Sequence, residues 1–135
     1  MKDRQVTTVG QGEAIWNNIH VRTLATGYMT LLDSLVSEKK QPSTLYCFAE
    51  TGEHKWYDLG AAIDQALRKH DLVDKPLKTG GPPGYLGSNS RSKADRLRRL
   101  GWKGEEGPGV NVFDSVQEEI DYLVKTGTLE NIEIK

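Results

Sequence analysis

Apolar residues recur at helical spacing in three stretches of this chain, and the segments between them are too short for a regular alternation of strand and helix. The first stretch covers residues 23–37, the second residues 56–70 and the third residues 116–125. A shorter helix is expected over residues 91–100, which Gly101 ends. Because a doubly wound sheet needs repeated strand–helix pairs, the pattern predicts a mostly helical α/β chain of α+β-like character, with a few short strands.

Helix ends and loops are marked by short polar signals. Thr23 is expected to cap the first helix, because its hydroxyl can accept a free first-turn N–H. Ser115 and Glu118 have the spacing of a capping box at the start of the third. Residues 75–87 contain two adjacent prolines among glycines and are expected to form a loop, as are residues 105–109.

Strands are expected where β-branched and aromatic residues gather. Residues 6–9 form one candidate, and residues 15–21 a second. Residues 45–49 are expected to form a short buried strand, with a turn at Gly52. Residues 132–134 alternate with charge and are expected to form a terminal strand.

Composition excludes several classes of protein. Hydrophobic residues make up 36% and charged residues 27%, which is typical of a folded chain. The 18 basic and 19 acidic residues give a net charge of -1, and no apolar run is long enough to cross a membrane, so we expect neither nucleic acid nor a membrane as partner. Cys47 is the only cysteine, and Met1–Gly10 lacks the apolar core of a signal peptide. A cytoplasmic location is therefore expected.

Charge is unevenly distributed along the chain. Residues 68–103 carry ten basic and three acidic residues, and residues 104–135 carry eight acidic and two basic residues. The two segments could attract each other, or each could form a solvated face. The basic stretch 91–103 contains Trp102 as its only aromatic residue, which argues against a nucleic-acid stripe. One or two of its cations could instead meet a ligand phosphate.

No local motif for catalysis or metal binding is present. The pair Gly10 and Gly12 lacks the third glycine and the following helix of a dinucleotide fingerprint, so a turn is expected there. The three histidines, His20, His54 and His70, do not lie three or four residues from one another or from the cysteine. We therefore predict no metal site and no cofactor site in this chain.

Three segments, taken in order, resemble one known family. Residues 92–94, Ser-Lys-Ala, and residues 100–103, Leu-Gly-Trp-Lys, resemble a late segment of the extended short-chain dehydrogenase/reductase family, the NAD-dependent epimerase/dehydratase group. Residues 16–21 resemble that family's entry into a long helix. Residues 50–56 and 87–91 are similar to segments of its fungal members. Within the late segment, the pattern predicts a short helix that buries Ala94 and Leu97, with Trp102 anchoring the turn after it.

The resemblance implies the C-terminal substrate-binding part of an extended Rossmann-type protein. Residues 1–135 would then form a single substrate-binding-type domain, without the N-terminal NAD(P)-binding domain. By the same resemblance, Asn17, Asn18, His20 and Arg91 lie near the substrate cleft. There Arg91 could bind a phosphate or carboxylate, and Asn18 a hydroxyl or carbonyl group. The alternatives are that Asn18 and His20 cap backbone at a strand end and that Arg91 is simply solvated.

The family's catalytic pair is missing, as is its cofactor motif. The family uses a Tyr-x-x-x-Lys pair, in which the tyrosine exchanges a proton with the substrate. None of the five tyrosines has a lysine four positions later, and Tyr122 and Lys125 are three apart. We therefore predict no catalytic residue here, although the resemblance implies NAD or NADP for the family. Thr23 also departs from the family, which usually has an acid there.

Three functions remain open from the sequence. The first is the substrate-binding portion of an NAD(P)-dependent oxidoreductase or epimerase, truncated, acting on a small molecule and not competent alone. The second is a non-enzymatic binding or regulatory module that associates with a full-length homologue or with itself. The third is a small acid–base enzyme using Glu50 with His20 or His54.

Overall fold

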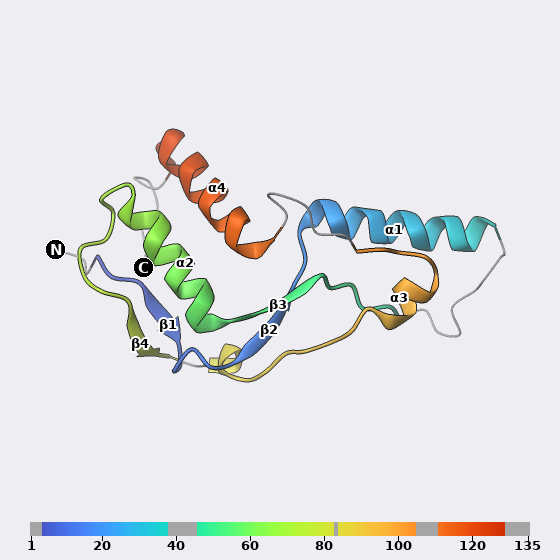
Figure 1. Ribbon diagram of the computed structural model, residues 1–135, viewed down its shortest axis with the longest axis horizontal. Coiled ribbons are helices and arrows are strands. Elements are labelled where there is room, and N and C mark those ends of the chain that lie inside the picture. The colour runs from blue at the N-terminus through green and yellow to red at the C-terminus, as the bar shows by residue number, and fades with distance from the viewer. Residues whose placement is uncertain (1–3, 38–45, 83, 105–110, 129–135) are drawn as a thin grey trace.

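The computed structural model describes residues 4–37, 46–82, 84–104 and 111–128 (Figure 1). Within those ranges, short strands and helices alternate irregularly along the chain. In order they are β1 (Thr7–Val9), β2 (Ile15–Asn18), α1 (Val21–Val36), β3 (Gly52–Lys55), α2 (Trp56–Arg68), β4 (Lys78–Gly81), a 3-10 helix (Gly84–Gly87), α3 (Asp95–Arg99) and α4 (Val112–Lys125).

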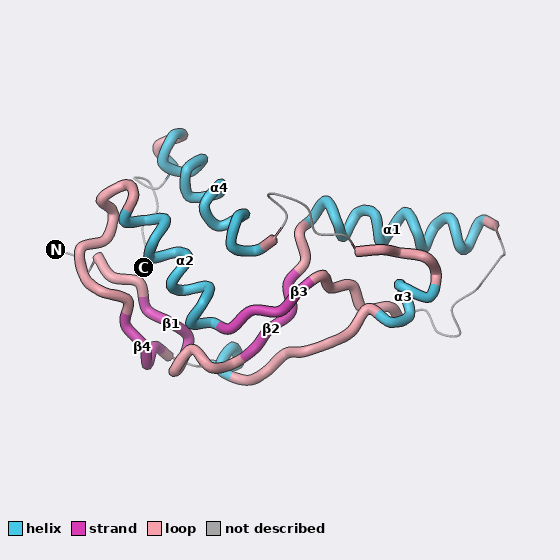
Figure 2. The backbone as a smooth tube through the Cα atoms, in the orientation of Figure 1, coloured by secondary structure: helices cyan, strands magenta, loops and turns pink. Residues whose placement is uncertain are grey.

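The elements form two ends joined by a pair of strands (Figure 2). At one end, α2 packs against α4 and against β1, which pairs in parallel with β4. At the other end, α1 packs against α3. β2 and β3 pair antiparallel between the two ends, with Ile15 opposite Lys55 and Asn18 opposite Gly52. β2 therefore carries Asn17 and Asn18, two of the four residues that the resemblance places near a substrate.

The buried core of the α1–α3 end forms where it was predicted. Ala94 and Leu97 are buried, which confirms the expectation for these two residues, and Trp102 is buried with them. Gly27 of α1 faces them, and a Cβ on it would lie 3.1 Å from Leu97 Cδ2. The absence of a side chain at Gly27 thus lets α1 approach the core closely. Half-buried apolar residues complete the packing: Ile19, Leu31, Cys47 and Ala49.

Two of the predicted helix caps are wrong, because an earlier residue takes the role. The His20 side chain caps α1 by accepting the Arg22 backbone N–H at 3.2 Å, so Thr23 lies inside the helix. Asn111 caps α4 with its side-chain oxygen, and the Ser115 hydroxyl donates to the Asn111 carbonyl. In both cases the side chain that can reach the first free N–H groups lies upstream of the expected one.

The other helices agree with the expected positions, with one shortened. α2 begins at Trp56, as predicted. α3 begins only at Asp95, because the residues before it run alongside β2: the Ser90 N–H donates to the Ile15 carbonyl at 3.0 Å. Gly101 follows α3 with a φ of 103°, as expected of a residue that ends a helix.

The strand predictions are partly wrong. β1 lies where expected, but β2 ends at Asn18 because the chain turns into α1. Residues 46–49 belong to no strand or helix, and Tyr46 is 84% exposed, so the expected buried strand is not formed there. Gly52 opens β3 instead of marking a turn, since it pairs with Asn18. β4 and the 3-10 helix occupy much of the loop expected over residues 75–87, while the expectations for residues 105–109 and 132–134 lie outside the described residues.

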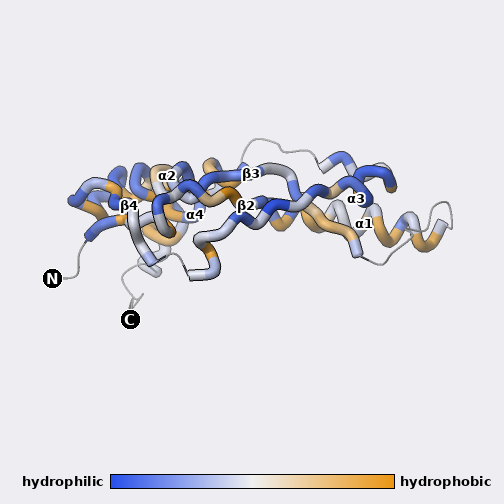
Figure 3. Tube along the Cα trace, turned by 90° about the horizontal axis from the view of Figure 1, so that it is seen from below, coloured by the Kyte–Doolittle hydropathy of each residue, from blue (hydrophilic) through white to orange (hydrophobic). Residues whose placement is uncertain are grey.

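The apolar face of α1 is largely exposed. The helix carries hydrophobic residues along its length (Figure 3), yet Val21 and Val36 are 71% and 76% exposed. Among the residues that the structure describes, none of the helices combines the length and apolarity needed to cross a bilayer. Further large side chains of α1 exposed on its surface are Tyr28, Met29, Leu32 and Leu35.

Candidate functional site

β2 is held on two sides, and this arrangement assembles the candidate site. On one side β3 pairs with it, and on the other residues 88–92 run alongside. The Asn17 N–H donates to the Ser90 carbonyl at 3.1 Å, and the Trp16 indole N–H donates to the Ser88 carbonyl at 2.7 Å. Three of the four sequence-predicted site residues, Asn17, Asn18 and Arg91, therefore lie on this one framework.

The Asn17 side chain joins β2 to β3 and to the segment of residues 88–92. Its side-chain oxygen accepts hydrogen bonds from the Ser92 backbone N–H and, at 3.0 Å, from the Ser92 hydroxyl. Its amide nitrogen donates to the Gly52 carbonyl at 3.5 Å. Both ends of the side chain are thus occupied by the protein, so Asn17 positions residues 90–92 and β3.

Arg91 is held by Glu53 of β3. The guanidinium donates two hydrogen bonds to the two carboxylate oxygens, at 2.9 and 2.8 Å. These bonds are the main reason that the pKa of Glu53 lies below its usual value and the pKa of Arg91 above its own. Because the guanidinium already faces a carboxylate, an anionic ligand would have to displace Glu53 to be bound bidentately by Arg91.

A cavity of about 430 Å³ opens beside this ion pair, lined by Glu53, Arg91, Ser92 and Lys93. Lys93 makes no hydrogen bond or ion pair with a described residue, although its charge helps to lower the pKa of Glu53. Its ammonium group therefore remains able to donate to a ligand. Sequence reasoning missed Glu53, Ser92 and Lys93 as site residues. The Ser-Lys-Ala segment was the one signal that could have pointed to two of them.

Asn18 of β2 and His54 of β3 meet across the strand pair. The Asn18 amide nitrogen lies 3.3 Å from His54 Nδ1. The His54 side chain is buried, and its Nε2 has no hydrogen-bond partner within the described residues. Burial lowers the pKa of His54, and the nearby Asp58 carboxylate opposes this effect. A neutral imidazole is therefore favoured here.

His20 has a structural role and is not part of this cluster. It caps α1, which is the backbone-capping alternative that the sequence left open. His70, the third histidine, lies 2.7 Å from Asp121 between α2 and α4.

Glu50 and the histidines do not form the acid–base pair of the third hypothesis. The Glu50 carboxylate accepts the Ala94 backbone N–H at 3.1 Å and a guanidinium N–H of Arg98. Neither bond involves His54. Glu50 and His54 therefore bind other partners instead of each other. Glu50 fixes the start of α3.

The early glycines are not followed by the helix of a dinucleotide fingerprint. Gly10 and Gly12 have φ values of 53° and 83°, and the chain after them enters β2 instead of a helix. A Cβ on Gly12 would lie 2.7 Å from Tyr57 Cβ, and the Tyr57 N–H donates to the Gly12 carbonyl at 2.9 Å. The close approach at Gly12 is therefore made by the protein's own α2. Within the described ranges, no three His, Cys, Asp or Glu residues are grouped so that they could hold a metal ion.

Comparison with known proteins finds a fungal relative. The chain is 26% identical over 138 aligned positions to Oxidase ucsJ from Acremonium sp. The alignment covers 85% of this chain and 40% of that protein, so the chain spans less than half the length of the curated relative that it matches. No protein-family model matches the sequence, and no solved structure does. The similarity to a fungal protein agrees with the fungal character of the motifs at residues 50–56 and 87–91.

Proposed function

We propose that this chain forms the substrate-binding portion of an NAD(P)-dependent oxidoreductase or epimerase-like protein. The short-chain dehydrogenase/reductase motifs support this proposal, as does the similarity to a protein named as an oxidase across most of the chain. The single observation that carries it is the cavity beside the Arg91–Glu53 pair, since the predicted Asn17, Asn18 and Arg91 all lie on the framework that builds it.

The cavity favours a polar substrate with hydroxyl or carbonyl oxygens. Lys93 supplies donors, and the carboxylate of Glu53 supplies acceptors. Asn17 and the backbone around Ser92 hold these groups in place, which is the role of supporting residues in a binding site. The proposed role is to bind and orient the substrate, because the glycines at residues 10 and 12 lack the following helix of a dinucleotide fingerprint and the sequence lacks the Tyr-x-x-x-Lys pair.

Two measurements test the proposal. The purified chain, given NADH or NADPH with panels of carbonyl compounds and nucleotide sugars, is expected to consume no cofactor. Turnover by the chain alone would overturn the proposal. In the second measurement, this chain replaces the segment of the Acremonium oxidase that it matches. The chimera is then expected to lose apparent substrate affinity with Lys93→Gln, whereas Arg99→Gln on α3 should leave it unchanged. Equal kinetics of both variants would also contradict the assignment.

A binding module that associates with a full-length relative is the second candidate, and exposed apolar surface favours it. Phe48 is 66% exposed, in addition to the exposed apolar face of α1. The backbone groups of residues 47–49 make no hydrogen bond with any described residue. An extended segment with open backbone groups can pair with the edge of a sheet in another chain.

Light scattering after size exclusion tests the second candidate. The chain is expected to run as a dimer or to join a full-length relative, and Leu32→Lys with Val36→Lys should abolish the association, because both side chains lie on the exposed face of α1. The matched control is Gln65→Lys, which adds a charge on exposed α2 surface. A monomer that binds no relative and no apolar dye would contradict this function.

A further inference from the structure

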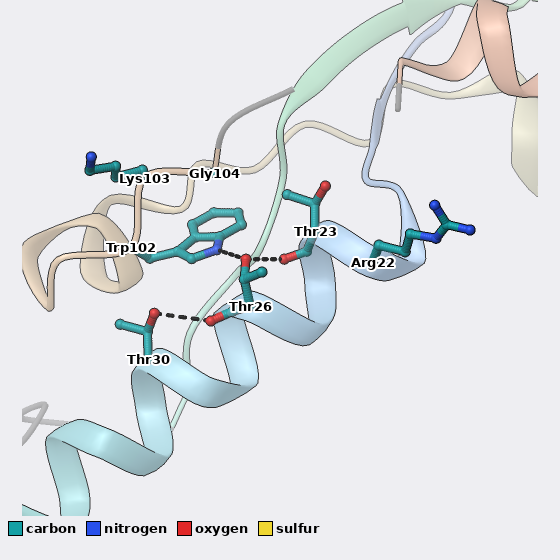
Figure 4. A pocket seen from close by; sticks show the side chains of 7 residues that line it. All are labelled: Arg22, Thr23, Thr26, Thr30, Trp102, Lys103 and Gly104. Carbon is teal, nitrogen blue, oxygen red and sulfur yellow. Dashed lines mark hydrogen bonds between the residues drawn. The ribbon is translucent and has the colours of Figure 1, made fainter. Parts of the chain in front are cut away.

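A second cavity, separate from the Arg91–Glu53 site, follows the first turns of α1. It has a volume of about 370 Å³ and lies between one face of the helix and the segment that follows α3 (Figure 4). Its size is in the range that small ligands use. In Figure 4, Arg22 and Lys103 lie at opposite ends, with the Trp102 ring between them. The groove is lined by Arg22, Thr23, Thr26, Thr30, Trp102, Lys103 and Gly104.

Two of the three threonines build the floor of this groove. The Thr26 hydroxyl donates to the Thr23 carbonyl at 2.7 Å and accepts the Trp102 indole N–H at 2.9 Å. The Thr30 hydroxyl donates to the Thr26 carbonyl at 3.0 Å. Their polar groups are therefore satisfied within the protein, which leaves their methyl groups and the indole as the apolar part of the lining.

Thr23 differs from the other two. The residue is only 7% exposed, it lines the groove, and its hydroxyl makes no hydrogen bond with any described residue. The Thr23 hydroxyl is not one of the atoms sealed from solvent without a partner, so it is accessible from the groove. Arg22, next to it, likewise makes no hydrogen bond or ion pair through its guanidinium within the described residues.

The electrostatics of the groove favour an anion. The described residues that line it include two cations, Arg22 and Lys103, and no acid. Arg22 and Thr23 lie in the first turn of the 16-residue α1, and that turn contains no acidic residue. The positive end of the helix dipole attracts negative charge.

We propose that this groove binds a small organic oxyanion. Its carboxylate or phosphate oxygens meet the guanidinium of Arg22 and the hydroxyl of Thr23 at the start of α1. Its apolar part lies against Trp102 and the threonine methyl groups, toward Lys103. The site shares no residue with the Glu53–Lys93 cavity and does not depend on the proposed oxidoreductase role.

Titration of the full chain, followed by ¹H–¹⁵N NMR, tests this site. The probes are phenyl phosphate, benzoate and inorganic phosphate. The expected result is a saturable shift of the backbone signals of Arg22 and Thr23 and of the Trp102 indole signal, while the side-chain signal of Asn18 stays unchanged. If only phenyl phosphate saturates the site, its ligand is a phosphate. If only benzoate does, the ligand is a carboxylate. If both do, the site accepts an oxyanion of either kind.

Variants of single residues distinguish a specific binding site from non-specific attraction between charges. Arg22→Gln is expected to weaken binding about tenfold, as loss of a charge-assisted hydrogen bond does. Thr23→Val should weaken it several-fold, and Thr23→Ser should restore it. Arg99→Gln, an exposed cation outside the groove, is the matched control and should have no effect.

Three results would overturn the proposal. They are shifts that rise linearly without saturating, equal weakening by Arg22→Gln and Arg99→Gln, or equal affinity for inorganic phosphate and phenyl phosphate. Because Arg22 is exposed, its variant remains informative even if Thr23→Val fails to fold.

Discussion

The Trp102 indole N–H donates a hydrogen bond of 2.9 Å to the Thr26 hydroxyl and so joins the segment after α3 to α1. Trp102 is buried with Ala94 and Leu97. The bond thus satisfies a polar group that would otherwise be buried without a partner, while the ring fills the core of this end of the molecule.

Changing Thr26 to valine should remove this bond while keeping the side-chain shape. We expect the free energy of unfolding to fall by about 1–3 kcal/mol, because the buried indole N–H loses its acceptor. Trp102→Ala should cost about 3–5 kcal/mol, since it also leaves a cavity. Urea unfolding measures both, with Tyr28→Phe on the exposed face of α1 as the control. A Thr26→Val variant as stable as the control would show that the bond contributes nothing.

Two glutamates offer a comparison of a buried and an exposed ion pair. Glu50 is buried and accepts N–H groups from Ala94 and Arg98, whereas Glu53 pairs with Arg91 at the surface. Glu50→Gln is therefore expected to lower the free energy of unfolding by about 1–3 kcal/mol, and Glu53→Gln by clearly less, because solvent screens the exposed pair. Chemical unfolding at pH 7, in low and in high salt, distinguishes them. If the Glu53 variant loses as much stability as the Glu50 variant, the ranking by burial is wrong.

Much of the helical architecture could be predicted from the sequence, because apolar spacing is a local signal. α2 begins at the expected Trp56, and Ala94 and Leu97 are buried as expected. Caps were harder to assign, since His20 and Asn111 compete with Thr23 and Ser115 for the same free N–H groups. The choice depends on where the preceding chain is held, which local sequence does not specify.

β3 and β4 could not be predicted, because their pairing partners are far along the chain. Gly52 pairs with Asn18, and Gly81 pairs with Val9, so two glycines that indicate turns lie in strands instead. The same wide separation along the sequence explains why the Glu53–Arg91 site could not be predicted. Glu53 and Arg91 are 38 positions apart, and nothing in either local pattern indicates that they form a pair. The predicted roles of Asn17, Asn18 and Arg91 in binding substrate stay predictions.

Alanine substitutions at Gly12 and Gly80 distinguish the stability cost of a steric clash from the cost of backbone strain alone. Both glycines have nearly the same φ, 83° and 85°. A Cβ on Gly12 would lie 2.7 Å from Tyr57 Cβ, whereas one on Gly80 would be 3.7 Å from a flexible glutamine side chain. Gly80→Ala should therefore cost about 1–2 kcal/mol from strain alone, and Gly12→Ala at least twice as much. Thermal unfolding tests the order, and equal losses would mean that α2 shifts freely away from Gly12.

His54 should make the protein less stable in mild acid. Burial lowers its pKa in the folded state below the ordinary value of 6.5, so the unfolded chain binds more protons as the pH falls. The stabilisation is therefore fully present above pH 6.5, the unfolded value, and is lost progressively as the pH falls through the folded pKa. Urea midpoints measured from neutral pH down to about pH 5.5 should decrease for the natural chain and stay flatter for His54→Gln. Tyr28→Phe, an exposed substitution on α1 that changes no group titrating in this range, is the control and should keep the slope. An unchanged slope in His54→Gln would assign the pH dependence to another group.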